Sequence, residues 1–364
     1  MIDIFFIFLA LLGFLKIFNF YYFNKNFKYK TKNPSLISII IPARNEEKRL
    51  ENLLKSIPDN TKYPIEIIIV DDNSIDNTLS IAKKYGAKIV KVKDFFDEEG
   101  KNIACYTGAL NSKGDYLLFI DADVFFENAA FDYIFKNIPE DGILTIQPYH
   151  QTEKFYEQFS LYSNLIVLLG LDIGKIKSPN IIKNGYFGPF FLIKREDYFK
   201  IDGHNSIKNS IIEDMELGKK LAEAGLKIYS IPHKKFIKFR MYPEGFKSLV
   251  NGWTKNMASG AMKSSISTII IITGIFASSL IIPINLVKNI IIMNYFNILL
   301  YVIFHFLYSV SLFLSVRNVG NFKFISCFLY PVFSIFYIFI LLSSFLITIF
   351  NLKINWRGRR IKIR

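Results

Sequence analysis

The sequence contains an Asp-x-Asp pattern, Asp121 and Asp123, directly after the apolar stretch 115–120. In an extended chain, residues two apart point to the same side, so both carboxylates can serve one side of a bound ion. Carboxylate oxygens suit a hard cation such as Mg²⁺ or Mn²⁺, which usually combines few carboxylates with substrate phosphates. Acidic pairs are also common in turns. Placed directly after a buried strand, this pair favours a metal site for a phosphate-bearing substrate.

Candidate residues follow two other apolar stretches in the same way. They are Pro42, Ala43, Asn45 and Glu46 after the first stretch, and Asp71 and Asp72 after the second. Asp72 could accept hydrogen bonds from a nucleobase or a ribose hydroxyl. The alternative is a helix N-cap, although Ser74 or Asp76 can fill that role.

A lysine and an acidic pair lie further along the chain. Lys101 follows Gly100 before a helical stretch, where it could balance the charge of a diphosphate or be an ordinary solvated lysine. Glu213 and Asp214 begin the helix predicted over 211–225. Acidic residues there complement the helix dipole, and the alternative is a general base that deprotonates an acceptor.

The histidines and cysteines are expected to be structural. The four histidines have no metal-ligand spacing; they are His150, His204, His233 and His305. With only Cys105 and Cys327, neither a disulfide scaffold nor a Cys-ligated zinc site is available.

The elements that must position the candidate residues alternate between strand and helix. Strands are predicted over 35–43, 65–70, 87–92, 115–120 and 142–147, and helices over 46–57, 79–86 and 102–112. Strands that are apolar throughout imply a parallel sheet covered on both faces. Such sheets bind ligands beyond the carboxyl ends of their strands, so the candidate residues should converge on one crevice.

The net charge of +14 on 364 residues is unevenly distributed. Four lysines without an acid lie in 24–32, and six basic residues without an acid lie in 353–364, whereas 33–232 is slightly acidic with 24 Lys/Arg and 29 Asp/Glu. A nucleic-acid-binding protein would carry its basic face on the folded domain. Because the basic residues flank apolar stretches instead, the expected partner is a membrane surface and not nucleic acid.

Four apolar stretches are long enough to cross a membrane, since about 20 residues of helix span about 30 Å of hydrocarbon. They are 2–23, 266–287, 289–316 and 324–350. The first, which has no cleavage site, is predicted to be a retained anchor. The basic residues at 24–32 place the following domain, 33–240, in the cytoplasm at the cell membrane.

The number of C-terminal crossings stays open in the sequence. Three crossings within 266–350 would leave the basic tail 351–364 outside, whereas two would keep it inside. Pro283 and Ser278/Ser279 indicate 266–287 as the segment that does not cross fully. The segment 241–265 is predicted to be an interfacial helix or a plain linker.

Several motifs occur in order along roughly residues 36–260. They are IIIPARNEEKRL, IIIVDDNSIDNT, GKNIACYTGA, LFIDADV, NGYFGPF, and IIEDMELG followed by GWTKN. Together they resemble the membrane-bound family 2 glycosyltransferases. The resemblance implies an α/β fold of the GT-A type, a mostly parallel twisted sheet, with transmembrane helices added at both ends.

The resemblance also implies residue roles. Pro42, Ala43, Asn45 and Glu46 would line the uridine pocket, and Asp71 would belong to the nucleotide-sugar site. Asp72 would contact the uracil or ribose, and Lys101 would face the diphosphate. Asp121 would reach the ribose or the metal, Asp123 would ligate Mg²⁺ or Mn²⁺, and Asp214 of the Glu213–Asp214 pair would be the catalytic base. Trp253 and Lys255 stand where many members carry a Gln/Arg-x-x-Arg-Trp sequence that closes over the substrates, a sequence that this chain does not reproduce.

Within the family, three segments are similar to the glycosyltransferases of carotenoid (staphyloxanthin-type) pathways. They are IQPYHQTEKFYEQFS, IDGH and FRMYPEGFKSLVNGWTKNMASGA. This similarity implies an inverting transfer of glucose from UDP-glucose to a lipid-soluble carotenoid carboxylate. The alternatives are transfer to polyprenyl phosphate or a diacylglycerol-type lipid, and, from another class, a non-catalytic membrane sensor of nucleotide sugars. The sequence specifies neither the sugar nor the oligomeric state.

Overall fold

The computed structural model describes residues 2–23, 34–58, 62–174, 181–182, 185–210, 213–233, 235–260, 265–350, 352–356 and 359–362. The basic stretch 24–32 therefore lies outside the described residues. The chain divides into two compact units. The α/β unit comprises 25–149 and 180–240, and the helical unit comprises 1–24, 150–179 and 241–364.

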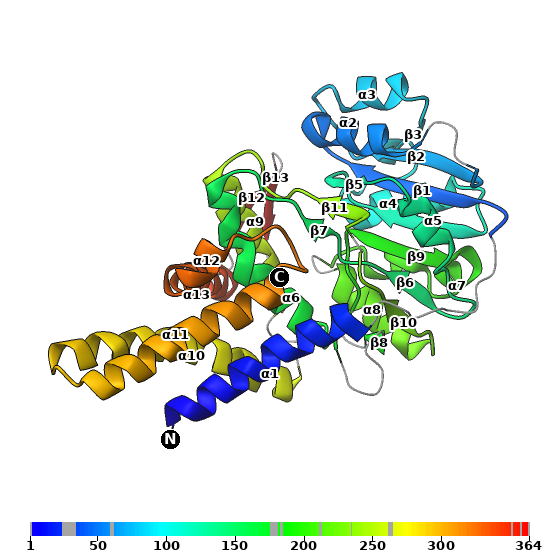
Figure 1. Ribbon diagram of the computed structural model, residues 1–364. Coiled ribbons are helices and arrows are strands. Elements are labelled where there is room, and N and C mark those ends of the chain that lie inside the picture. Colours follow the sequence, from blue (N-terminus) through cyan, green and yellow to red (C-terminus); the bar gives the residue numbers. More distant parts are fainter. Residues whose placement is uncertain are drawn as a thin grey trace. The chain divides into compact units, whose positions relative to one another are not determined.

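An eight-stranded sheet forms the centre of the α/β unit (Figure 1). Its strands, in chain order, are β1 Ile37–Ala43, β2 Ile65–Asp71, β3 Lys88–Lys91, β4 Tyr116–Ile120, β6 Ile143–Thr145, β8 Ile181–Ile182, β9 Phe190–Lys194 and β10 Ile228–Ser230. The spatial order is β3-β2-β1-β4-β9-β6-β10-β8. β1 pairs in parallel with β2 and β4, and β2 with β3, so the predicted parallel strands are present.

One central strand was not predicted. β9 runs antiparallel to both β4 and β6 and separates them, so the strand expected over 142–147 does not lie beside β4. A second antiparallel pair, β5 Val124–Phe126 with β11 Ile237–Phe239, lies outside the main sheet. The five-residue β9 is too short for its periodicity to reveal its partners, because pairing between strands distant in sequence sets its position.

Helices cover the sheet. They are α2 Glu47–Ser56, α3 Thr78–Lys84, α4 Lys101–Leu110, α5 Ala130–Phe135, α7 Arg195–Lys200 and α8 Glu213–Glu223. α2 buries Leu50, Leu53 and Leu54, the i, i+3, i+4 spacing of one helix face. α4 comes so close to the sheet that a Cβ added at Gly108 would lie 2.4 Å from the Ile40 side chain. This glycine lets α4, and with it Lys101, approach β1.

The helical unit contains the apolar segments. Its elements are α1 Ile2–Phe23, the 3₁₀ helix η3 Phe155–Ser160, α6 Leu161–Gly170, α9 Phe246–Gly260, α10 Ile266–Ile291, α11 Tyr295–Val316, α12 Phe324–Phe328, α13 Tyr330–Ile349, β12 Lys353–Trp356 and β13 Arg359–Lys362. Among the described residues, four helices are long and apolar enough to cross a membrane: α1, α10, α11 and α13.

Three sequence boundaries differ from the structure. α10 continues through Pro283 to Ile291, so proline and the serine pair do not interrupt it. The stretch 324–350 is divided into α12 and α13, because Pro331 lacks a backbone N–H and fits best in the first turn of a new helix. The segment 150–179, expected within the domain 33–240, groups with the helical unit.

Candidate active site

The register of the sheet places three strand ends at one edge. Ala43 of β1 pairs with Asp71 of β2, and Ile40 of β1 pairs with Phe119 of β4. Because these strands are parallel, the residues that follow them emerge on the same side. The sequence-predicted residues after β1, β2 and β4 are thus brought to the edge at which open α/β sheets bind ligands.

The loops after β1 and β2 hold each other through side-chain hydrogen bonds. Asn45 has a left-handed backbone (φ 53°), which asparagine tolerates better than most residues. Its side-chain oxygen accepts from the Ile75 N–H at 2.9 Å, and its own N–H donates to Ser74 Oγ at 3.1 Å. The Glu46 N–H donates to Thr78 Oγ1 at 2.8 Å. Asn45 and Glu46 therefore hold the loop after β1 against the loop after β2.

The two adjacent aspartates have different roles in this loop. Asp71 Oδ1 accepts from the Ser74 N–H at 3.0 Å, which closes a turn, and Asp76 Oδ1 accepts from the Thr78 N–H at 3.0 Å at the start of α3. Asp72 is thus not needed as the helix cap. Its Oδ1 accepts from the Gly100 N–H at 3.3 Å, so it holds the residue that precedes Lys101.

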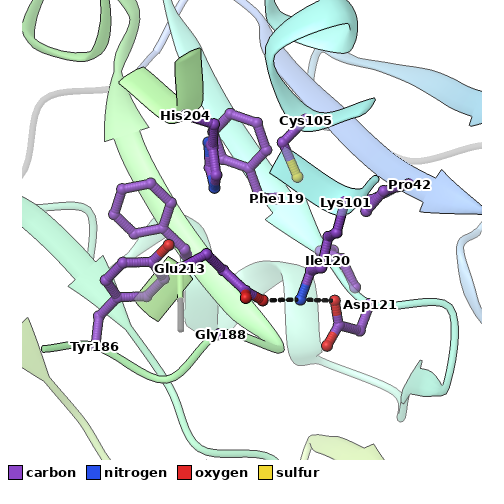
Figure 2. A pocket seen from close by; sticks show the side chains of 11 residues that line it. Pro42, Lys101, Cys105, Phe119, Ile120, Asp121, Tyr186, Gly188, His204 and Glu213 are labelled. Atoms are coloured by element: carbon purple, nitrogen blue, oxygen red, sulfur yellow. Dashed lines mark ion pairs between the residues drawn. The ribbon is translucent and has the colours of Figure 1, made fainter. Parts of the chain in front are cut away.

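Lys101 bridges two carboxylates that are far apart in sequence. Its Nζ lies 2.7 Å from Asp121 Oδ1 and 2.8 Å from Glu213 Oε1 (Figure 2). Burial lowers the pKa of this ammonium, but the charges of Asp121 and Glu213 outweigh it, so the pKa lies well above its ordinary value. Lys101 is therefore a permanent cation at the centre of the site and not a solvated surface lysine.

Asp123 has a buried carboxylate oxygen that could bind a cation. Its Oδ1 is buried and has no hydrogen-bond partner among the described residues. Burial, followed by the charge of Asp121, raises the Asp123 pKa to about 7, and Arg49 on α2 opposes the rise. A buried oxygen donor beside a second carboxylate fits Mg²⁺ or Mn²⁺. The described residues contain no cluster of three such side chains, so substrate oxygens would have to complete the coordination.

Arg49 was not singled out from the sequence. Its guanidinium donates to Glu46 Oε2 at 3.2 Å, which makes Glu46 half of a buried ion pair. The i, i+3 spacing on α2 is the signal that could have indicated this pair.

Asp214 lies at the start of α8 beside a glycine of the loop before β9. Its Oδ1 accepts from the Met215 N–H at 2.9 Å, and its backbone carbonyl accepts from the Tyr186 N–H at 3.3 Å. A Cβ added at Gly188 would lie 3.6 Å from Asp214 Cβ. Burial, followed by the charge of Glu213, raises the Asp214 pKa to about 7. Asp214 can thus exchange a proton near neutrality, as a general base must.

A small pocket opens beside the Lys101 bridge. Its lining residues are Pro42, Lys101, Cys105, Phe119, Ile120, Asp121, Tyr186, Gly188, Phe191, His204 and Glu213. The lining away from the bridge is largely aromatic, and burial lowers the pKa of His204 to about 3, so this imidazole is neutral. Sequence reasoning missed Tyr186 and Gly188; the NGYFGPF segment was the available signal.

Each of the four histidines contacts neighbouring groups of the fold, as expected for structural residues, and His204 also lines the pocket. Tyr198 Oη lies 3.0 Å from His204 Nδ1, and Asn164 Nδ2 lies 2.9 Å from His150 Nδ1. His233 Nδ1 accepts from the Lys235 N–H at 2.7 Å, and the His305 ring packs on Phe328.

Trp253 and Lys255 lie on α9 of the helical unit. The Trp253 indole is buried, its Nε1 donates to Ser160 Oγ at 2.9 Å, and its ring packs edge-on against Tyr242. These contacts attach α9 to η3 within that unit. Both residues thus belong to the helical unit, whereas the strand-end carboxylates belong to the α/β unit.

Comparisons with known proteins agree with this architecture. The sequence model described as glycosyl transferase family 2 matches residues 38–201. A 4,4'-diaponeurosporenoate glycosyltransferase of Staphylococcus aureus strain N315 is 34% identical over 355 residues, which cover 94% of this chain and 93% of that protein. The counterpart in strain MRSA252 is 38% identical over 249 residues, 66% of each chain.

A solved structure supports the fold. The mannosyltransferase PcManGT from Pyrobaculum calidifontis, in complex with GDP-Man and Mn²⁺, aligns with a TM-score of 0.52 at 13% identity and covers 95% of this chain and 98% of that one. At this identity the likeness concerns the fold alone. It confirms the α/β arrangement of the GT-A type that the sequence predicted.

Proposed function

Because this chain belongs to glycosyl transferase family 2 and is a glycosyltransferase, we propose that it moves glucose from UDP-glucose to the carboxylate of a membrane-soluble polyene acid. The family and the class of enzyme are the premise. The donor, the acceptor and the roles of individual residues are the proposal, and the strand-end site of the α/β unit supports it.

The donor occupies the carboxyl edge of the sheet. The uridine lies against the loops after β1 and β2, where Asp72 accepts from the uracil imide or the ribose. The hydrogen bond from Gly100 to Asp72 links this end of the donor to Lys101. This one contact therefore connects the recognition of the nucleoside to the placement of the Lys101 ammonium, which faces the diphosphate.

Asp123 and Asp121 would hold a divalent cation, Mg²⁺ or Mn²⁺. The buried oxygen of Asp123 and its raised pKa are the observations that support this assignment. When bound, the cation supplies positive charge to the oxygens of the departing diphosphate.

Lys101 stabilises the negative charge that develops as the bond between the anomeric carbon and the diphosphate breaks. Donors fixed in place before the reaction do this best, because no reorganisation is needed at the transition state. The Asp121 and Glu213 carboxylates, at 2.7 and 2.8 Å, hold the Lys101 ammonium in one position. Glu213 is thus a positioning residue for Lys101.

The acceptor attacks the anomeric carbon from the face opposite the diphosphate, which inverts its configuration. An acceptor oxygen forms the new C–O bond while the diphosphate leaves with the electron pair of the old one. A carboxylic acid, with a pKa near 4–5, is already ionised at neutral pH and has no proton to lose. For an alcohol acceptor the proton would pass to Asp214.

The helical unit gives this chemistry access to a lipid acceptor. Its apolar helices would hold the enzyme in the membrane, where such an acceptor is dissolved. The 34% identity to a 4,4'-diaponeurosporenoate glycosyltransferase extends over 94% of this chain, and this observation supports the acceptor assignment.

The test uses membranes containing the full chain, Mn²⁺ and a panel of radiolabelled nucleotide sugars, followed by identification of the labelled lipid. The expected product is a glucosyl ester of a polyene acid, formed from UDP-glucose. Asp123→Asn should abolish turnover, whereas Asp141→Asn, which alters an exposed ion pair with Lys227, should retain it.

The other outcomes are equally specific. Labelled polyprenyl phosphate or a diacylglycerol-type lipid would replace the proposed acceptor. Binding of a nucleotide sugar without turnover on any lipid would support a sensor, and full activity of Asp123→Asn would refute the site.

A further inference from the structure

Three long helices of the helical unit run alongside one another. α1 and α10 are antiparallel: near the start of α1, Asn285 Nδ2 donates to Asp3 Oδ2 at 3.0 Å, and further along, a Cβ added at Gly13 would lie 2.7 Å from Ile271. Residues early in α1 thus lie beside residues late in α10.

α11 runs in the same direction as α1. Tyr301, near its start, donates a hydrogen bond to Asp3, and Ser315, at its far end, donates to the Phe14 carbonyl at 3.1 Å. The start of α1, the end of α10 and the start of α11 therefore share one end of this three-helix bundle.

α12 turns back along α11 and stops near the middle of it. The Phe324 ring lies 5.5 Å from Phe313, and the Phe328 ring lies 4.9 Å from His305. Tyr330, the first residue of α13, packs on Tyr308 with ring centroids 4.3 Å apart. α13 thus begins halfway along the bundle and not at an end of it.

α13 then leads away from the bundle. Ser334 and Tyr337 contact the middle of α10, at Ser279 (2.6 Å) and Phe276 (4.9 Å between rings). Later in α13, Ser344 Oγ donates to the Thr254 carbonyl of α9 at 2.7 Å. In Figure 1, α1, α10 and α11 are seen lengthwise, whereas α13 is seen nearly end-on. α13 therefore lies across the three helices.

One face of α13 is apolar and about half exposed at every position. It comprises Val332, Ile335, Phe339, Leu342, Phe345 and Ile349. The opposite face is buried against the rest of the unit. An apolar stripe at helical spacing that the rest of the described unit leaves uncovered fits a helix that packs on protein with one face and meets lipid with the other.

We propose that α1, α10 and α11 cross the membrane and that α12–α13 dips into the cytoplasmic leaflet and returns, with the apolar face of α13 against lipid. The partner of this face is the bilayer. α12–α13, and not the 266–287 segment indicated by the sequence, is then the part that does not cross.

Charge placement supports this arrangement. With three crossings, the four lysines of 24–32 and the six basic residues of 353–364 face the same side, which the excess of basic residues marks as cytoplasmic. If α13 crossed as well, one of the two basic stretches would lie outside. Basic residues on the cytoplasmic side also attract the anionic lipids of that leaflet.

The test maps two positions of the full chain in intact bacterial cells. Met293→Cys, between α10 and α11, and Asn355→Cys, after α13, are each treated with a membrane-impermeant maleimide. The unaltered chain, whose Cys105 and Cys327 are buried, is the blank. Labelling in detergent first establishes that each new cysteine reacts.

Met293→Cys should be labelled in intact cells, and Asn355→Cys only after permeabilisation. Labelling of Asn355→Cys in intact cells would overturn the proposal. Protection of Met293→Cys would also overturn it, because four crossings with the tail in the cytoplasm place the segment between α10 and α11 in the cytoplasm. Neither result depends on the proposed enzymatic reaction.

A depth measurement tests α13 itself. Nitroxides attached at Val332→Cys, Phe339→Cys and Leu346→Cys share one exposed face, seven residues apart. An interfacial helix gives all three similar collision rates with oxygen and with a water-soluble nickel complex. A helix that crosses would change depth by about 10 Å between successive labels, since each residue rises about 1.5 Å.

Discussion

Asp214 should matter for an alcohol acceptor and hardly at all for a carboxylic acid. The perturbation is Asp214→Asn, which keeps the shape of the side chain and removes its basicity. Asp214 can accept a proton near neutrality because burial and Glu213 raise its pKa to about 7. Glu213 does not readily replace it, since its carboxylate is paired with Lys101 at 2.8 Å.

The size of the effect follows from the acceptor. An alcohol keeps its proton at pH 7.5, so loss of the base should lower kcat by about 10²–10⁴-fold. A carboxylic acid with a pKa near 4–5 is more than about 99% ionised at that pH, so kcat should fall by less than about tenfold. The predicted difference between the two acceptors is thus at least about tenfold.

The unaltered enzyme provides an independent measurement. Because the Asp214 pKa is raised, the base is lost as the pH falls through about 7. With the alcohol, kcat should therefore decline about tenfold per unit below pH 7. With the carboxylic acid, and with saturating Mn²⁺ to keep Asp123 ionised, this limb should be absent until the acceptor itself becomes protonated near pH 5.

The assay measures initial rates with a polyene acid and the corresponding alcohol, at saturating UDP-glucose and Mn²⁺, with chromatographic separation of the glucosylated products. Glu223→Gln, an exposed change at the end of the same helix, is the matched control and should leave both rates unchanged. Equal losses for both acceptors in Asp214→Asn would refute the assignment of Asp214 as a base for alcohols.

Three further outcomes are expected. Lys101→Met should lower kcat by about 10²-fold, because the ammonium stabilises the departing diphosphate. It should also move the acid limb of the alcohol pH profile above pH 7, because Lys101 lowers the Asp214 pKa. A limb that does not move would mean that Lys101 and Asp214 are uncoupled. Chelation by EDTA should abolish turnover and Mn²⁺ or Mg²⁺ should restore it, whereas turnover in EDTA would exclude the cation from the reaction. Gly108→Val should lower the free energy of unfolding by about 1–3 kcal/mol, because a Cβ at position 108 would meet the Ile40 side chain at 2.4 Å. Denaturant titration measures the change, with the exposed Leu110→Ala as the control. Unchanged stability would show that α4 can shift.

Local patterns determined much of the α/β unit. Of the apolar stretches that became β1, β2 and β4, β4 is buried throughout, β1 at all but one residue and β2 over its last four residues. Each is followed by the residues that the sequence indicated. Strand identity and strand ends depend on runs of five to seven residues, which a single sequence contains. The same holds for the apolar helices, because their length and composition alone make them able to cross a membrane.

Contacts between distant residues required the tertiary structure. Lys101 lies between Asp121 and Glu213 only because α4, β4 and α8 meet at one edge of the sheet, and no spacing in the sequence records that meeting. β9 is inserted between β4 and β6 for the same reason. α13 has the composition of a crossing helix, and only its contacts with Ser279, Phe276 and Thr254 reveal that it lies across the others. The composition of a segment determines whether it can be buried in a protein core or in a membrane, whereas the path of the chain determines which neighbours it packs against.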